Sequence, residues 1–209
     1  MLAKIKICGI TNAEDAHLAV DAGADALGFI FYPQSPRFVE IQVVKSIVNQ
    51  LPPFVLPIGV FVNEEQSMVQ NVMDVCGLAL AQLHGEESPA YCESLGHPVL
   101  KGIRLRDRSS FLALAEYKGR AGVRGFVLDA FTESEYGGTG KVADWDLAAE
   151  AAKAAPILLA GGLSSENIQE AIKKVQPYGV DVSSGVEASP GKKDSAKVQA
   201  FIHAAQLVY

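Results

Sequence analysis

The stretch Lys4-Ile5-Lys6-Ile7-Cys8-Gly9-Ile10-Thr11 contains the structural unit from which the rest of the chain is built. Its first half alternates polar and apolar residues, as a β-strand does, and Gly9 then allows a turn. Thr11 or Asn12 can cap a helix expected over residues 13–22. Cys8 stands where the strand ends and the turn begins, so its thiol can face a ligand instead of the core.

The same strand-then-helix pattern recurs along the whole chain. Apolar runs with β-strand character occupy residues 4–7, 26–31, 56–62, 78–83, 99–103, 125–129, 157–160 and 179–182. Helix-like segments follow them at 13–22, 41–51, 64–75, 89–95, 109–117, 145–154, 165–175 and 195–207. Strands that alternate with helices form a parallel sheet, because each helix carries the chain back across it. Such units, each about 25 residues long, predict a closed (β/α)8 TIM barrel near its lower size limit.

An open doubly wound sheet is the competing architecture. A G-x-G-x-x-G turn after the first strand would favour it, and Cys8-Gly9-Ile10-Thr11-Asn12-Ala13 lacks that pattern. No low-complexity linker divides the sequence. We therefore expect residues 1–209 to form a single barrel domain.

Composition narrows the class of protein. The chain is 49% hydrophobic and 20% charged, which is typical of a soluble globular protein. A formal net charge of −6 argues against a nucleic-acid partner but not against a small anionic substrate, whose site depends on local groups. The apolar run 54–62 is too short to cross a membrane, and no secretory signal is present, so a cytoplasmic location is expected. Three scattered cysteines without a C-x-x-C pair predict neither a disulfide framework nor a metal site.

Two loops rich in small residues follow the seventh and eighth predicted strands. They are Gly161-Gly162-Leu163-Ser164 and Ser183-Ser184-Gly185. Glycines before a helix let backbone N–H groups approach an anion, and barrels commonly bind phosphate after these two strands. Either loop alone is explained as well by turn and capping chemistry. Their paired placement predicts a phosphate site formed by Gly161, Gly162, Ser183, Ser184 and Gly185.

An acid–base pair is predicted at two other strand ends. Asp129 terminates the apolar run 126–128, and a carboxyl group at a barrel mouth is a candidate for proton transfer. Cys8 lies five strands away, on roughly the opposite side of the mouth. This arrangement suits removal of a proton from one side of a substrate and delivery of a proton to the other. A buried, inert cysteine is the alternative for Cys8, and it is the interpretation adopted for Cys76 and Cys92.

Three further residues have two interpretations each. Arg37, in a loop with two prolines, can present its guanidinium fork to a carboxylate or lie exposed on the surface. His84 is either a ligand contact or a strand-end histidine hydrogen-bonded to backbone. Lys101 is an alternative nucleophile, since a buried barrel lysine can form a Schiff base. The segment 137–141 departs from the Walker pattern and is interpreted as a lid or a surface loop.

Taken in order, the motifs at the strand ends resemble those of one family. They are Lys6-Ile7-Cys8-Gly9-Ile10-Thr11, Ser35-Pro36-Arg37, Gln82-Leu83-His84-Gly85, Leu128-Asp129, Gly137-Gly138-Thr139-Gly140, Leu159-Ala160-Gly161-Gly162-Leu163 and Asp181-Val182-Ser183-Ser184-Gly185-Val186-Glu187, followed by Pro190-Gly191-Lys192-Lys193-Asp194. The chain resembles the phosphoribosylanthranilate isomerase family of tryptophan biosynthesis from end to end. One departure is Val142-Ala143, where an aromatic residue is expected.

The resemblance implies an Amadori rearrangement, an aldose–ketose isomerisation of N-(5′-phosphoribosyl)anthranilate without metal or cofactor. It implies that Asp129 is the general acid that protonates the ring oxygen and that Cys8 is the general base that removes the proton from sugar carbon 2. Arg37 would hold the anthranilate carboxylate, the glycine and serine loops the phosphate, and His84 would contact the substrate. Whether the protein is a monomer or a homodimer stays open.

These roles set requirements on protonation. A free thiol has a pKa near 8.5, so Cys8 needs a lowered pKa or must lose its proton during turnover, with Lys6 as a possible helper. Asp129 must be protonated when it acts, which burial among Phe126, Leu128 and Phe131 would favour.

Three other functions compete with this one. A histidine-pathway isomerase would carry aspartate in place of Cys8. Schiff-base chemistry at Lys101 would leave Cys8 and Asp129 without roles. A non-catalytic phosphate-binding barrel would still bind its ligand after the loss of either group.

Overall fold

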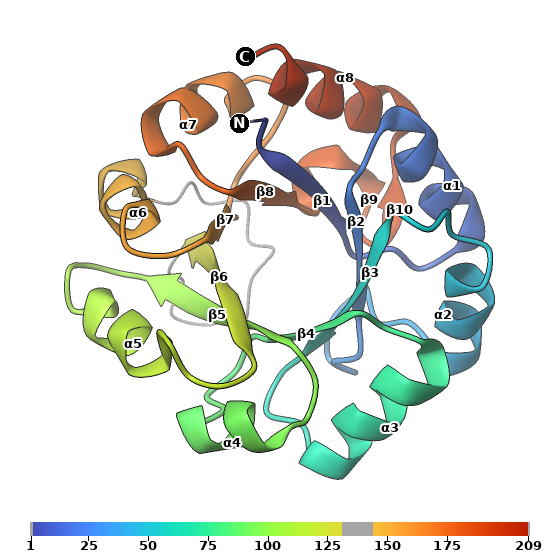
Figure 1. The fold of residues 1–209 in the computed structure, drawn as a ribbon. Helices are drawn as coiled ribbons and strands as arrows, with labels where there is room; N and C mark the ends of the chain where they lie inside the picture. The colour runs from blue at the N-terminus through green and yellow to red at the C-terminus, as the bar shows by residue number, and fades with distance from the viewer. Residues whose placement is uncertain (1, 131–143, 209) are drawn as a thin grey trace.

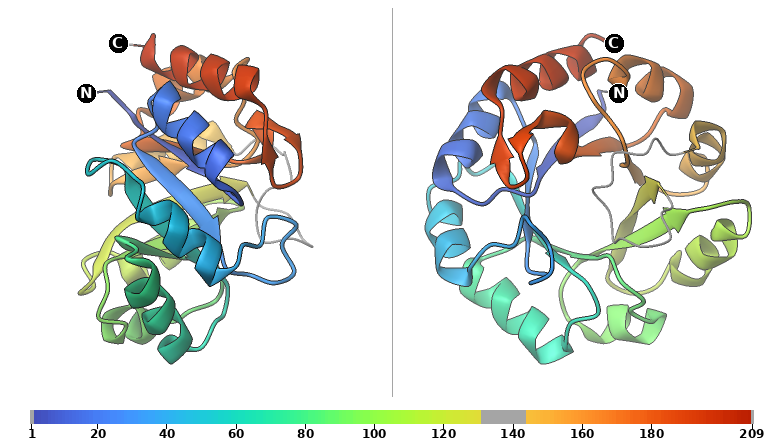
Figure 2. Two further views of the ribbon diagram at one scale, coloured as in Figure 1. Left: turned by 90° about the vertical axis from the view of Figure 1, so that its right-hand side faces the viewer. Right: turned by 180° about the vertical axis from the view of Figure 1, so that it is seen from behind.

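The structure, a computed structural model, describes residues 2–130 and 144–208. Within these ranges eight parallel strands close into a barrel in the order β1 to β8, and β8 pairs with β1 (Figure 1). Helices surround the barrel, as the two further views show (Figure 2). The predicted (β/α)8 barrel is confirmed, and the open sheet is wrong. The segment 137–141 and Val142-Ala143 lie outside the described residues.

The strands are β1 (Lys4–Cys8), β2 (Ala26–Ile30), β3 (Leu56–Phe61), β4 (Leu80–Leu83), β5 (Val99–Leu105), β6 (Val123–Ala130), β7 (Ile157–Leu159) and β8 (Gly179–Val182). The helices are α1 (Ala13–Ala22), α2 (Ile41–Val48), α3 (Gln66–Cys76), α4 (Pro89–Ser94), α5 (Ser110–Tyr117), α6 (Trp145–Ala152), α7 (Ile168–Val175) and α8 (Ser195–Gln206). In the described part of the chain, no helix combines the length and the apolar character that crossing a bilayer requires.

The strands alternate between two cores. Side chains such as Ile5 and Ile7 pack outward against the helices in a large hydrophobic core. A smaller cluster lies inside the barrel and includes Ile58, Leu100 and Val127. Full burial of an aliphatic side chain contributes roughly 1.5–3 kcal/mol, so both layers stabilise the closed sheet.

Helix α7 begins three residues later than predicted, and the cause is a local hydrogen-bond pattern. The Asn167 side chain accepts a hydrogen bond from the Ser164 backbone N–H at 2.9 Å and donates one to the Gly162 carbonyl at 2.8 Å. The loop after β7 is therefore held as a turn by an asparagine that precedes the helix. This bracing restrains the backbone of one predicted phosphate loop.

A short hairpin between β8 and α8 was not predicted. The 3-10 helix η1 (Ser184–Val186) leads into β9 (Glu187–Ser189), which pairs antiparallel with β10 (Lys192–Lys193). Strands of two or three residues have no readable periodicity, so the sequence pattern could not reveal them. The hairpin brings Glu187 and Lys193 together, with consequences for the site.

Candidate active site

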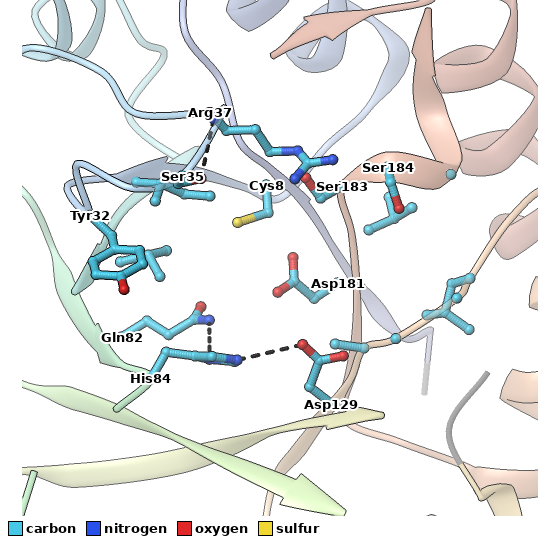
Figure 3. A pocket seen from close by; sticks show the side chains of 18 of the residues that line it. Cys8, Tyr32, Ser35, Arg37, Gln82, His84, Asp129, Asp181, Ser183 and Ser184 are labelled. Atoms are coloured by element: carbon cyan, nitrogen blue, oxygen red, sulfur yellow. Dashed lines mark hydrogen bonds and ion pairs between the residues drawn. The ribbon is translucent and has the colours of Figure 1, made fainter. Parts of the chain in front are cut away.

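A pocket opens at the C-terminal ends of the strands (Figure 3). It is lined by every residue predicted to form the site: Cys8, Arg37, His84, Asp129, Gly161, Gly162, Ser183, Ser184 and Gly185. Parallel strands of a closed barrel end on the same side, which is why residues far apart in sequence meet here. The pocket also contains Tyr32, Gln82 and Asp181, to which the sequence analysis had assigned no role.

Cys8 ends β1 with its side chain toward the pocket and is 7% exposed. The neighbouring strand makes room for it, because a Cβ atom at Gly28 would lie 2.6 Å from the Cys8 Sγ atom. Burial raises the pKa of the Cys8 thiol. The positive charges of Lys6 and Lys193 act to lower that pKa but do not offset the effect of burial. The lowered pKa considered from the sequence is therefore absent, and a base at this position must lose its proton during turnover.

Asp129 lies near the end of β6 and points into the barrel, where it is 7% exposed. Phe126 and Leu128 point the other way and belong to the outer core, because side chains alternate along a strand. The apolar surroundings expected from these two neighbours are therefore wrong, and Phe131, the third residue of that prediction, lies outside the described residues. Instead the His84 ring faces the carboxyl group, with Nε2 3.5 Å from Asp129 Oδ2.

A buried ion pair lies next to Cys8 inside the barrel. Lys6 donates hydrogen bonds of 2.8 Å to both Asp181 Oδ2 and Gln82 Oε1. Two buried oxygens at the pocket wall, Asp181 Oδ1 and Ser183 Oγ, have no hydrogen-bond partner among the described residues. A polar ligand could satisfy both, since buried polar atoms are rarely left unpaired. The sequence signal for this cluster was a polar residue at an inward-facing position of an otherwise apolar strand, namely Lys6 in β1, Gln82 in β4 and Asp181 in β8.

Arg37 is held in place by the hairpin. Its Nε and Nη2 atoms donate to the two carboxylate oxygens of Glu187, each at 2.8 Å. Burial acts to raise the pKa of Glu187, but hydrogen bonds and charge from Arg37 and Lys193 outweigh it and leave that pKa lowered. The guanidinium lines the pocket, but the edge bound to Glu187 is not offered to a ligand.

Lys193 connects the same carboxylate to the strand ends. Its Nζ atom lies 3.0 Å from Glu187 Oε1 and donates to the carbonyls of Cys8 at 2.6 Å and Ser183 at 3.3 Å. This buried ammonium therefore joins the ends of β1 and β8 to the hairpin. No local sequence pattern predicted the contacts of Glu187 and Lys193, because they depend on the fold of the hairpin.

The two predicted phosphate loops lie against each other. Gly161 and Gly162 have positive φ angles of 85° and 64°, which glycine adopts without strain. Gly185 packs so closely on the Leu163 carbonyl that a side chain there would collide with it. Both loops border the same end of the pocket, which is the arrangement that the phosphate prediction requires.

Lys101 lies outside this pocket. It points from β5 toward the helices, where Nζ donates to the Gly85 carbonyl at 2.6 Å and to Glu87 Oε2 at 2.9 Å. The Tyr117 ring covers it at 5.6 Å from the ring centroid. Because this ammonium is buried in an ion pair away from the barrel mouth, the structure gives no support to Schiff-base chemistry at Lys101.

The fold and the pocket define the class of protein: a (β/α)8 barrel with a polar pocket at the C-terminal ends of its strands, where barrel enzymes carry their active sites. A family model for "N-(5'phosphoribosyl)anthranilate (PRA) isomerase" matches residues 5–204. The chain belongs to this isomerase family, in agreement with the resemblance of its motifs.

Individual relatives agree with this assignment. The N-(5'-phosphoribosyl)anthranilate isomerase of Pelobacter propionicus is 54% identical over 205 residues, covering 98% of this chain and 96% of its own. The crystal structure of phosphoribosyl anthranilate isomerase from Thermotoga maritima is 39% identical, with a TM-score of 0.90 over 97% of this chain and 98% of that one. A phosphoribosyl anthranilate isomerase solved in complex with reduced 1-(o-carboxyphenylamino)-1-deoxyribulose 5-phosphate is also 39% identical, with a TM-score of 0.87 and the same coverage.

Proposed function

We propose that this chain converts N-(5′-phosphoribosyl)anthranilate into 1-(o-carboxyphenylamino)-1-deoxyribulose 5-phosphate, with Asp129 as general acid and Cys8 as general base. The observation that carries the proposal is that one pocket contains both groups, Arg37 and the two glycine–serine loops. The substrate has a matching set of features, namely a phosphate at one end, a carboxylate at the other and a sugar ring between them.

The two groups would act on different atoms of the sugar. A protonated Asp129 gives its proton to the ring oxygen as the bond from that oxygen to carbon 1 breaks, and the nitrogen lone pair forms a C=N bond to carbon 1. Cys8 takes the proton from carbon 2, the electron pair of that C–H bond forms a double bond between carbons 1 and 2, and the electron pair of the C=N bond returns to the nitrogen. The resulting enolamine becomes the ketone when carbon 1 gains a proton and the enol loses one. No electrons enter or leave the molecule.

Binding would come from the pocket's two anion sites. The backbone amides of the loops after β7 and β8 would hold the phosphate, because amide groups in glycine-rich turns bind anions. Arg37, oriented by Glu187, would meet the anthranilate carboxylate. His84 would contact the substrate or Asp129 from the side of β4.

Two variants test the acid–base assignment. Asp129→Asn and Cys8→Ala should each lower kcat by about 10²- to 10⁴-fold, the usual contribution of a general acid or base. Binding of the reduced 1-(o-carboxyphenylamino)-1-deoxyribulose 5-phosphate should change little, because neither variant removes an anion contact. Cys76→Ala, a cysteine outside the pocket, is the matched control and should retain kcat. Near-normal turnover in either active-site variant would refute the assignment.

The proposed contact with Arg37 has its own test. Arg37→Met should raise the Michaelis constant more than it lowers kcat, because it removes binding of a group that does not react. An unchanged Michaelis constant would remove the proposed role. The cytoplasmic location and the choice between monomer and homodimer remain predictions. One solved relative, 37% identical with a TM-score of 0.87, is a monomer generated from the dimeric isomerase of Thermotoga maritima.

A further inference from the structure

A line of hydrogen-bonding side chains crosses the barrel interior from Lys6 to Asp129. Lys6 Nζ lies 2.8 Å from Gln82 Oε1, Gln82 Nε2 lies 3.1 Å from His84 Nδ1, and His84 Nε2 lies 3.5 Å from Asp129 Oδ2. Figure 3 shows the last two contacts as a continuous path between β4 and β6. All four side chains are buried.

The direction of this line is determined at its Lys6 end. An ammonium group donates hydrogen bonds and cannot accept them. Burial acts to lower the pKa of Lys6, but the charge and hydrogen bond of Asp181, together with a contribution from Cys8, outweigh it, so the group stays charged. Gln82 must therefore turn its oxygen toward Lys6, and its NH2 group consequently faces His84.

The orientation of Gln82 in turn determines where the His84 ring carries its proton. Because the amide NH2 donates to Nδ1, that nitrogen must keep its lone pair. The ring proton then sits on Nε2, the nitrogen that faces Asp129. The separation of 3.5 Å from Asp129 Oδ2 is longer than an ordinary hydrogen bond, and contacts of this kind in active sites commonly tighten when substrate binds.

Two glycines give this line its space. A Cβ atom at Gly102 would lie 2.5 Å from His84 Nδ1, and one at Gly28 would lie 3.0 Å from Lys6 Cε. Any larger residue at either position would push the ring or the lysine out of line. The packing thus holds the partners in one arrangement.

We infer that Lys6 and Gln82 are positioning residues that fix His84 in the tautomer whose N–H faces Asp129. With that N–H directed at Oδ2, His84 faces the Asp129 carboxyl group while the proton of that group is transferred. After the transfer, the same N–H stabilises the carboxylate that remains. The inference rests on the proposed function only in giving Asp129 the role of acid.

Nitrogen NMR of histidine-labelled protein tests the tautomer directly. In the unmodified chain the Nδ1 of His84 should show the shift of an unprotonated nitrogen and Nε2 that of a protonated one. The chain has four histidines, and loss of one signal pair in His84→Gln assigns the resonances. A protonated Nδ1 in the unmodified protein would overturn the inference, and this measurement requires no variant to fold.

Gln82→Glu is nearly isosteric but reverses the direction of the hydrogen bond between residue 82 and His84 Nδ1. A carboxylate only accepts hydrogen bonds, so it can accept from the Lys6 ammonium on one side. On the other side it can accept from His84 only if Nδ1 carries the ring proton. We expect Nδ1 to become protonated and kcat to fall by about tenfold or more, with a smaller change in the Michaelis constant. Gln50→Glu introduces the same charge at an exposed site in the chain and should alter neither the His84 signals nor kcat. An unchanged His84 tautomer in Gln82→Glu would contradict the inference whatever the rate.

The two hypotheses fail separately. Near-normal turnover in Asp129→Asn would remove the acid assignment while leaving the measured tautomer as it is. A protonated Nδ1 together with a strong loss of turnover in Asp129→Asn would remove the positioning role and leave the acid in place.

Discussion

The guanidinium of Arg37 and the carboxylate of Glu187 lie side by side, joined by two parallel hydrogen bonds of 2.8 Å. Their side chains are 10% and 4% exposed, so the pair is largely removed from water. Paired contacts of this kind fix the plane of a guanidinium as well as its position. Glu187 therefore determines how Arg37 is presented at the pocket, although it does not line the pocket itself.

Glu187→Gln should affect both binding and stability. It leaves Arg37 and Lys193 as buried cations without their anion, and breaking a buried pair costs roughly 3–5 kcal/mol. Misorientation of Arg37 should raise the Michaelis constant by about tenfold, equivalent to about 1.4 kcal/mol. Urea unfolding and steady-state kinetics measure the two effects. Glu86→Gln is the control, because Glu86 pairs with Arg104 at the surface and its side chain is 77% exposed. This variant should lose only about 0–1 kcal/mol of unfolding free energy. Equal losses in the two variants would contradict the structural role of Glu187.

The same carboxylate predicts how stability depends on pH. The pKa of Glu187 is lower in the folded chain than in the unfolded one, so the folded state binds fewer protons between the two values. Its stabilising contribution is complete above the unfolded pKa of about 4.3 and is lost as the pH falls through the folded value. The difference in unfolding free energy between the parent and Glu187→Gln should therefore stay constant from pH 7 to about 5 and shrink as the pH falls below about 4.3 toward the lower folded pKa, as checked by urea unfolding at each pH. A difference that stays constant to acid pH would show that this ionisation does not contribute.

The buried thiol of Cys8 predicts slow alkylation at neutral pH. Because burial raises its pKa, the thiolate fraction should be below that of a free cysteine, and iodoacetamide should react faster as the pH rises. Mass spectrometry of the Cys8 peptide follows the reaction, and Cys8→Ser reports any background from the other two buried cysteines. Rapid modification with a midpoint below about 8.5 would show that Lys6 lowers the pKa more than burial raises it.

Gly28→Ala should separate positioning of Cys8 from stability. The added methyl group would lie 2.6 Å from Cys8 Sγ, so the thiol must move, and a displacement of about 1 Å can reduce turnover by about 10²-fold. Gly59→Ala meets similar crowding on the outer face of β3, 2.8 Å from Leu78 and Phe61 side-chain atoms. Both variants should lose about 1–3 kcal/mol of stability, but Gly59→Ala should keep its kcat. Normal turnover in Gly28→Ala would mean that the Cys8 thiol need not lie where the structure places it.

The barrel and the membership of its pocket were predictable from the sequence. Strand and helix periodicities are local properties, and their regular alternation leaves few topologies. Once the barrel is known, residues at strand ends must gather on one side, which is how Cys8, Asp129 and the loops after β7 and β8 were identified. Only the ends of some elements were misplaced, as at α7, where Asn167 holds the preceding residues in a turn.

The partners of these residues were decided by the tertiary structure. Arg37 meets Glu187 from 150 positions away, and Lys6 meets Asp181 from 175 positions away. Lys101 also looked like a pocket residue, but its strand turns it toward Glu87 and the helices. A pattern along the chain shows that a charge will be buried, but the folded packing selects the group that compensates it, because desolvation and pairing depend on everything that surrounds the site.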